Sequence, residues 1–443
     1  MAQVNVKNRS NLKTHEGGPA KMINAEMQLK RAVLACLLWE DTFYESGEDI
    51  ATRMANLVAN VEASKVMRLA EVARKRYNLR HAPLMLLREA TRYGAPIAES
   101  LANTISRADE LSEFVSLYWK NGKEPLSKQA KMGLAKAFTK FDEYSLSKYN
   151  RDKDVKLRDV LFLSHAKPKD IAQADLWKRL VDGTLEAPDT WERNLSSGAD
   201  KKETWERLMK ENKLGALALL RNLRNMIETD VDTATIRTAL KTMKTEKVLP
   251  FRFIAAEKHA PSLSADIEGA MIRSLGDYEK LSGKTILLVD SSGSMVGTKV
   301  SGRSELDRLD AACALAILAR EICEDVRVFA FTTSGDWGSA KSVVTEVPNR
   351  RGFALRDFIT NMRHGGTYMG GAVTEMNKIP HDRLIVFTDE QSADKVPDPV
   401  AKNAYVVNVA SYENGVGYGR WNHIDGFSTA VMDYIIEYEK EFE

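Results

Sequence analysis

Cysteine is scarce in this 443-residue chain, which contains only Cys36, Cys313 and Cys323. No C-x-x-C pair exists, so the sequence offers neither a zinc ribbon nor a redox motif. Cys313 and Cys323 lie ten positions apart in one amphipathic stretch. A helix there would separate them by roughly 15 Å, which is too far for a disulfide. The cysteines therefore indicate a protein of a reducing compartment.

Long apolar runs are also absent, because none reaches the roughly 20 residues that a transmembrane helix needs. The polar residues 1–11 lack the apolar core of a signal peptide. Hydrophobic residues make up 44% and charged residues 28% of the chain, as in an ordinary soluble globular protein. We therefore expect a cytoplasmic protein with no membrane partner.

The net charge of +2 combines two halves of opposite sign. Residues 1–283 contain 47 basic and 39 acidic residues, whereas residues 284–443 contain 17 and 23. The basic surplus of the first half favours a polyanionic partner such as nucleic acid. A surplus of this size is also compatible with an ordinary solvated surface.

The hydrophobic pattern changes near Ser282-Gly283. Before this point apolar residues recur at helical spacing, as in Val66, Leu69, Ala70 and Ala73, and turn signals such as Tyr93-Gly94 separate many short helices. No strict repeat period is visible. Serial short helices with one apolar face predict stacked helical pairs, that is, an irregular α-solenoid.

After this point short apolar runs alternate with helical stretches. The pattern predicts strands at residues 285–289, 326–331, 343–347, 384–387 and 405–409, and helices at 309–322, 354–362 and 429–439. This alternation predicts a doubly wound α/β sheet. Ligands of such sheets bind at the carboxyl ends of the strands.

Three segments at predicted strand ends or in loops carry oxygen ligands. They are Asp290-Ser291-Ser292-Gly293-Ser294, Gly365-Gly366-Thr367 and Thr388-Asp389. Carboxylate and hydroxyl oxygens suit a hard divalent cation such as Mg²⁺. The sequence therefore predicts a metal site formed by Asp290, Ser292, Ser294, Thr367 and Asp389, with one position open for an acidic group of a partner.

Together these ordered segments resemble the von Willebrand factor A family, in which the five positions form the metal-ion-dependent adhesion site. The alternative is a degenerate, empty site on a scaffold domain. None of the seven histidines forms an H-E-x-x-H or similar cluster, and no nucleophile–base pair is visible. We therefore expect a binding site with no catalytic residues, and a protein that is not an enzyme.

The helical half resembles the TROVE domain of Ro ribonucleoproteins over most of residues 15–283. The matching segments keep the order and spacing of that family. They are Gln28-Leu29-Lys30-Arg31 with Phe43-Tyr44, Lys148-Tyr149 with Leu163-Ser164-His165-Ala166-Lys167-Pro168, and Ala218-Leu219-Leu220-Arg221-Asn222-Leu223 with Leu249-Pro250-Phe251-Arg252. Followed by an A-type domain, the set is that of the Ro architecture.

The resemblance implies a flexible N-terminus at residues 1–14, a HEAT-like helical ring at 15–283 and a closing A-type domain at 284–443. It implies binding of small noncoding Y-like RNA on the outer ring surface and of single-stranded 3′ ends of misfolded RNA in the central hole, in RNA quality control or stability. An exoribonuclease or another protein would bind through the metal site.

A basic cluster from Lys148 to Arg158 gives the RNA prediction a physical basis, since phosphates attract Lys and Arg. In the family, the Lys of Lys-Tyr and the His of Leu-Ser-His contact Y RNA, which corresponds to Lys148 and His165 here. A family Arg falls near Asp152, so Arg151 would substitute for it. Tyr149 and Lys167 complete this predicted contact. Interspersed acidic residues also allow a plain solvated helix face.

A second basic stretch runs from Arg74-Lys75-Arg76 through Arg80 to Arg88 and Arg92. Arg88 and Arg92 are four apart and would share a helix face, as would Arg76 and Arg80 if the helix continues that far. Such a stripe is predicted to contact RNA on the inner wall of the ring or on the outer surface.

Three functions stay open at this stage. The leading one is an RNA-binding subunit of Ro type. The alternatives are a metal-dependent protein-interaction module with a helical scaffold, and a metal-dependent hydrolase, for which the sequence supplies no convincing general base.

Overall fold

The computed structural model describes residues 25–34, 47–276, 278–300, 305–334, 341–410 and 420–442, except for the side chains of residues 47–50, 441 and 442. The predicted flexible N-terminus at 1–14 and the Phe43-Tyr44 segment lie outside the described residues. Within this part of the chain, no helix is both long enough and apolar enough to cross a bilayer.

The described chain divides into two compact units. One contains residues 49–248 and 256–270, which are helical. The other contains the sheet, from residue 271 onward, together with the helix α1 (Ala25–Leu34) and residues 249–255. The predicted ranges 15–283 and 284–443 stay a prediction, but α1 packs with the sheet although it precedes the helical unit in sequence.

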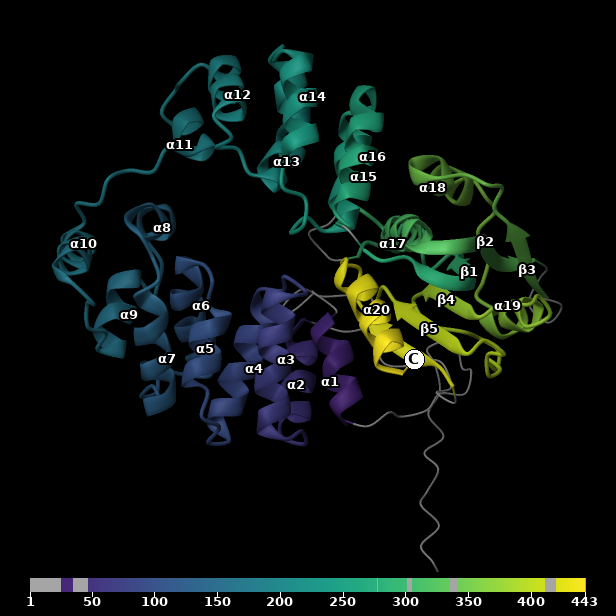
Figure 1. Ribbon diagram of the computed structural model, residues 1–443, viewed down its shortest axis with the longest axis horizontal. Coiled ribbons are helices and arrows are strands. Elements are labelled where there is room, and N and C mark those ends of the chain that lie inside the picture. The colour runs from purple at the N-terminus through teal and green to yellow at the C-terminus, as the bar shows by residue number, and fades with distance from the viewer. Residues whose placement is uncertain are drawn as a thin grey trace, which may run out of the picture. The chain divides into compact units, whose positions relative to one another are not determined.

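Short helices make up the helical unit (Figure 1). In chain order they are α2 (Gly47–Val58), α3 (Ala63–Lys75), α4 (His81–Arg92), α5 (Ala98–Thr104), α6 (Ala108–Tyr118), α7 (Lys128–Phe138), α8 (Glu143–Tyr149), α9 (Leu157–Ser164), α10 (Ile171–Asp182), α11 (Trp191–Ser196), α12 (Lys201–Lys210), α13 (Ala216–Glu228) and α14 (Thr233–Thr242). Two further helices, α15 (Pro250–His259) and α16 (Ser264–Arg273), lead to the sheet, with a 3₁₀ turn at Pro261–Leu263 between them.

These helices stack in two layers. Helices α3, α5, α7 and α9 pack in series, α4, α6 and α8 form a second series, and α3–α4 and α6–α7 contacts join the layers. Close approach is possible because α7 carries Gly133, where a Cβ would lie 2.9 Å from Ala98 O on α5's first residue. Side-chain caps fix the helix starts, as where Asp170 accepts the Gln173 N–H at 2.7 Å. The predicted helical repeat fold is confirmed.

The sheet has six strands in the order β3-β2-β1-β4-β5-β6, all parallel except for the antiparallel β2–β3 pair. The strands are β1 (Leu281–Asp290), β2 (Cys323–Ser334), β3 (Lys341–Glu346), β4 (Arg383–Thr388), β5 (Asn403–Asn408) and β6 (Asn422–Asp425). The helices are α17 (Arg308–Ile322), α18 (Gly352–Thr360), α19 (Met369–Met376) and α20 (Ala430–Phe442). The predicted doubly wound fold is confirmed, while β6 and α19 were not predicted.

Apolar side chains fill both faces of the sheet. Ile286, Leu288 and Leu384 pack against α19 on one face. Helix α17 packs on β1, β2 and β4 and is itself covered by α18, which explains why it is buried on nearly all sides. Cys313 lies in α17 and Cys323 begins β2; both are free and buried, although the two do not share the single helix that the sequence predicted.

Candidate metal centre and nucleic-acid interface

The order in which strands are added to the sheet reverses between the parallel strands β1 and β4. Four of the predicted metal ligands, Asp290, Ser292, Ser294 and Asp389, lie at the carboxyl ends of these two strands, and Thr367 lies in the loop between α18 and α19. Asp290 is the last residue of β1 and is fully buried. Its carboxylate accepts the Ser292 N–H at 2.9 Å and the Thr388 hydroxyl at 2.7 Å. Burial, and then the neighbouring Asp389, raise the pKa of Asp290 to about 7.

The structure brings all three predicted segments together. The Gly293 N–H donates to Gly365 O at 2.6 Å, which joins the first segment to the second. The Ala393 N–H donates to Thr367 O at 3.0 Å, which joins the second segment to the chain after Asp389. A Cβ at Gly365 would collide with Thr333 O at the end of β2, so only glycine allows this approach.

These groups fit a hard divalent cation by their chemistry. Asp290 and Asp389 are two fully buried carboxyl groups, and the hydroxyls of Ser292 and Ser294 lie 3.2 Å apart. No group of three or more His, Cys, Asp or Glu side chains suited to a metal exists among the described residues. A cation here would therefore need the Ser and Thr hydroxyls as well as the two carboxylates.

The sequence analysis assigned no role to two side chains beside this site. Arg308, the first residue of α17, is buried and donates to Asp389 Oδ2 at 3.1 Å. His364 is half-buried, and its ring nitrogens lie 2.8 Å from Ser291 O and 3.2 Å from Thr360 O. His364 therefore braces the loops through backbone carbonyls, as a positioning residue would. Their contacts with the predicted metal segments do not follow from local spacing, because Asp389 lies 81 residues from Arg308 and Ser291 lies 73 residues from His364.

A buried polar network begins at the residue after Asp389. Glu390 is fully buried, has a positive φ of 64° and bonds to Arg31 of α1. Arg31 Nε also donates to Asp425 Oδ1 of β6 at 2.6 Å. His423 Nδ1 lies 2.6 Å from Glu390 Oε1. The Gln28–Arg31 segment thus carries a cation that anchors α1 to the sheet.

The predicted RNA contacts lie on α8, on α9 and in the segments that follow them. Lys148 and Tyr149 end α8 and are half-buried, whereas Arg151, His165 and Lys167 are exposed. His165 ends α9 in the left-handed conformation with φ of 53°. Arg151, His165 and Lys167 form no ion pair with the part of the chain that the structure describes. They are therefore available to an anionic ligand.

Tyr149 belongs to a cation–aromatic cluster that the sequence did not reveal. Arg107 Cζ lies 4.8 Å and Lys148 Nζ lies 5.8 Å from the centre of the Tyr149 ring. Lys148 Nζ is also 5.4 Å from the ring centre of the exposed Tyr144. Arg107 is itself paired with Asp109 at 2.9 Å, so Lys148 is the cation that this cluster presents beside aromatic surface, an arrangement suited to both phosphates and bases.

The second basic stretch is organised differently from what the sequence predicted. Helix α3 ends at Lys75 and α4 begins at His81, so Arg76 and Arg80 do not share a helix face. Arg88 is buried and paired with the adjacent Glu89, which contradicts a place on an exposed stripe. Arg92 lies at the surface, and its Nη2 is 3.1 Å from Glu124.

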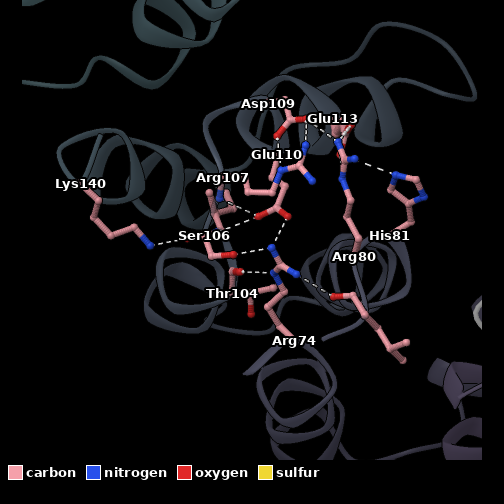
Figure 2. Close-up of polar contacts among 12 residues, drawn as sticks. Arg74, Arg80, His81, Thr104, Ser106, Arg107, Asp109, Glu110, Glu113 and Lys140 are labelled. Atoms are coloured by element: carbon pink, nitrogen blue, oxygen red, sulfur yellow. Dashed lines mark hydrogen bonds and ion pairs between the residues drawn. The ribbon is translucent and has the colours of Figure 1, made fainter. Parts of the chain in front are cut away.

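Ion pairs also occupy the arginines at the start of this stretch (Figure 2). Arg74 pairs with Glu110, and Arg80 bridges Asp109 at 2.6 Å and Glu113 at 3.0 Å. The partners lie about 30 residues away on α6, beyond the reach of helical spacing rules. This stretch is therefore neutralised within the fold, in contrast to the segment from Arg151 to Lys167.

Comparison with known proteins agrees with this organisation. Residues 178–274 match the sequence model of the TROVE domain. The fold is similar to that of a crystal structure of the Deinococcus radiodurans RO (RSR) protein, with a TM-score of 0.60, 20% sequence identity, and coverage of 92% of this chain and 98% of that one. No curated protein sequence matches the chain.

Proposed function

We propose that this chain is a Ro-type protein that binds small structured noncoding RNA through its helical unit, because residues 178–274 match the TROVE model and the fold is similar to that of the RO (RSR) protein. RNA binding of Ro type is the function that the comparisons support. The finer proposal is that Y-like RNA contacts Lys148, Tyr149, Arg151, His165 and Lys167, and that single-stranded 3′ ends of misfolded RNA enter a central hole.

One observation carries this proposal: the two basic stretches of the helical unit differ in their partners. Arg74, Arg80 and Arg88 are paired with carboxylates inside the fold. Arg151 and Lys167 are exposed and pair with no described carboxylate. An RNA phosphate that binds Arg151 or Lys167 displaces only water and counterions. Binding to Arg74, Arg80 or Arg88 would also require an ion pair within the fold to break, which costs additional free energy.

The test compares Lys148→Ala/Arg151→Ala/His165→Asn with the unmodified chain, using a hairpin RNA with a 3′ tail at two salt concentrations. Asn replaces His165 because Asn tolerates a positive φ better than Ala does. Each lost phosphate contact should reduce the salt slope by about one unit and weaken binding.

The matched control is Lys201→Ala/Lys202→Ala, which removes two exposed positive charges from α12. It should bind RNA almost as tightly as the unmodified chain, because it lowers the net charge without changing residues 148–167. Equal losses in both variants, or a salt-independent affinity, would reject the assignment of the RNA to residues 148–167.

We further propose that the site of Asp290, Ser292, Ser294, Thr367 and Asp389 takes Mg²⁺ or a similar ion. Ser294 is half-buried and Gly293 and Gly366 are exposed, so the loops that carry the ligands reach the surface. An acidic side chain of a protein partner, such as an exoribonuclease, would complete the coordination there. The absence of enzymatic activity and the cytoplasmic localisation stay predictions.

A further inference from the structure

Phe162 is exposed on the outer face of α9. Its relative exposure is 61%, whereas Leu157, Val160, Leu161 and Ser164 bury the opposite face of the same short helix. Single exposed apolar residues are common on protein surfaces, so exposure alone indicates nothing. The neighbours of Phe162 are what distinguish it.

Exposed basic residues precede and follow Phe162 in the chain, and one of them shares its helix face. Arg158 lies four residues before Phe162, so the two share a helix face, and both are exposed. His165 follows three residues later, where its N–H donates to Phe162 O at 3.2 Å. Lys167 and Lys169 are exposed in the segment that leads to α10. An exposed aromatic ring thus belongs to a stretch of exposed basic residues.

The nearby acidic residues take part in contacts within the fold. Asp159 accepts the Lys156 N–H at 2.8 Å at the start of α9, and its other oxygen lies 3.9 Å from Arg158 Nε in a long, solvent-exposed ion pair. Asp170 caps α10. Asp152 forms an ion pair with Lys156 at 2.6 Å. The charge presented beside Phe162 is therefore mainly positive, which complements a polyanion.

We propose that Phe162 stacks on an unpaired base of the bound RNA while Arg158 and Lys167 hold the flanking phosphates. This inference rests on the proposed RNA-binding function and adds a residue that reads whether the RNA is paired or unpaired. A ring among cations is the usual composition of single-strand sites, where aromatic side chains stack on bases and a positive groove follows the backbone. Protein interfaces, by contrast, are depleted in lysine at their centre.

Stacking on an aromatic side chain is sequence-tolerant, because every base has a π-face. The surface would therefore prefer loops, bulges and ends over duplex without demanding one base. A duplex hides its bases from the ring and leaves only phosphate contacts, which Phe162 does not make.

The experiment measures the affinity of four full-length variants for two probes. The variants are Phe162→Ala, Phe162→Leu, Phe162→Trp and, as a control, Tyr93→Ala, which removes a similarly exposed ring (62%) after α4. The probes are a hairpin RNA with an unpaired loop and tail, and a blunt duplex RNA of equal length. Unchanged melting temperatures confirm that each variant is folded.

Phe162→Ala should weaken hairpin binding by about 5- to 150-fold, the range that corresponds to one lost base–aromatic stack. The salt slope should stay the same, because no charge is removed. Phe162→Leu should lose nearly as much, Phe162→Trp should bind at least as tightly as the unmodified chain, and duplex binding should not change in any variant.

Several results would overturn the inference. Normal hairpin binding by Phe162→Ala excludes a contact, and normal binding by Phe162→Leu means an apolar contact without stacking. A loss in Tyr93→Ala equal to that in Phe162→Ala means that exposed rings matter generally. If the unmodified chain binds RNA and Phe162→Ala binds it equally well, only this inference is refuted. If the unmodified chain binds no RNA, the proposed function itself is refuted.

Discussion

Replacing Arg31 by Met should destabilise the sheet unit, because it leaves two buried carboxylates without their cation. Arg31 is 3% exposed, and its partners Glu390 and Asp425 are fully buried. Met keeps most of the apolar stem of Arg and removes only the charge and the hydrogen bonds. Removing one partner of a buried ion pair costs roughly 3–5 kcal/mol, since the remaining charge stays in a low-dielectric environment.

The loss should appear as a lower melting temperature and as faster hydrogen exchange. In a unit of this size each kcal/mol lowers the melting temperature by roughly 2–4 °C, so we expect a decrease of about 6–20 °C. Backbone amides of β5 and β6 should exchange faster, because α1 packs on β6. Lys30→Met is the control: Lys30 is 47% exposed and pairs with Glu26 at 3.6 Å, so it should change stability by less than about 0.5 kcal/mol.

A second substitution identifies the cause. In the Arg31→Met background, Glu390→Gln removes one of the stranded charges and should restore part of the lost stability. The double-mutant cycle of Arg31→Met and Glu390→Gln measures the coupling free energy between the two side chains, which would be zero if they acted independently. Equal melting temperatures for Arg31→Met and Lys30→Met, or strictly additive effects of the two changes, would refute this account of the network.

Two further outcomes concern the metal site and pH. Asp290→Ala should abolish Mg²⁺ binding in calorimetry while the fold is kept, and EDTA should leave hairpin RNA binding unchanged; loss of RNA binding on chelation would move the RNA to the α/β domain. Burial lowers the pKa of His423 although Glu390 opposes the shift, so the unfolded state takes up a proton below about pH 6.5 before the folded state does. Stability therefore decreases as the pH falls below about 6.5, and His423→Gln should remove this component. The raised pKa of Asp290 has the opposite effect on stability between about pH 4 and 7, so the unmodified chain must be compared with His423→Gln. Urea titrations at several pH values give the free energy of unfolding of both proteins. If the two free energies change with pH in parallel, His423 does not contribute as expected.

The strands that sequence patterns predicted are those with continuous apolar runs, and β6 has none. Asn422–Asp425 contains a histidine and an aspartate, and both are buried because Arg31 and Glu390 supply partners. Arg31 lies 394 residues before its partner Asp425, and Glu390 lies 33 residues before its partner His423. Local hydrophobicity cannot reveal a strand whose burial depends on remote charges.

Helix α19 was missed for a related reason. It begins with Gly370 and Gly371 after Met369, and glycine lowers helix propensity by about 1 kcal/mol per residue. Asp394 offsets this, since its two carboxylate oxygens accept the N–H groups of both glycines at 2.8 Å. The cap comes from the segment after β4 and is invisible to rules that search for caps within a few residues.

The predicted metal loop and Arg88 differ in how far local sequence determines their placement. Asp290 ends β1 and Asp389 directly follows β4, and strand ends of a doubly wound sheet meet at a position that topology fixes. Whether an arginine faces solvent or a carboxylate depends on helix packing, which spacing does not determine. Arg74 and Arg80 find their partners on α6, and Arg88 is buried within α4.

The loop after β4 links the proposed metal site to the buried network around Arg31. Asp389 belongs to the proposed metal site and accepts a hydrogen bond from Arg308, while the next residue, Glu390, bonds to Arg31 on α1. Two buried cations from different helices thus hold consecutive carboxylates, and the positive φ of Glu390 sets the turn between them. A site whose ligand is fixed from both sides needs little rearrangement to bind a cation, because its geometry exists before the ion arrives. The Gln28–Arg31 segment, whose sequence resembles the TROVE domain, therefore supports the proposed metal site of the sheet unit through Arg31.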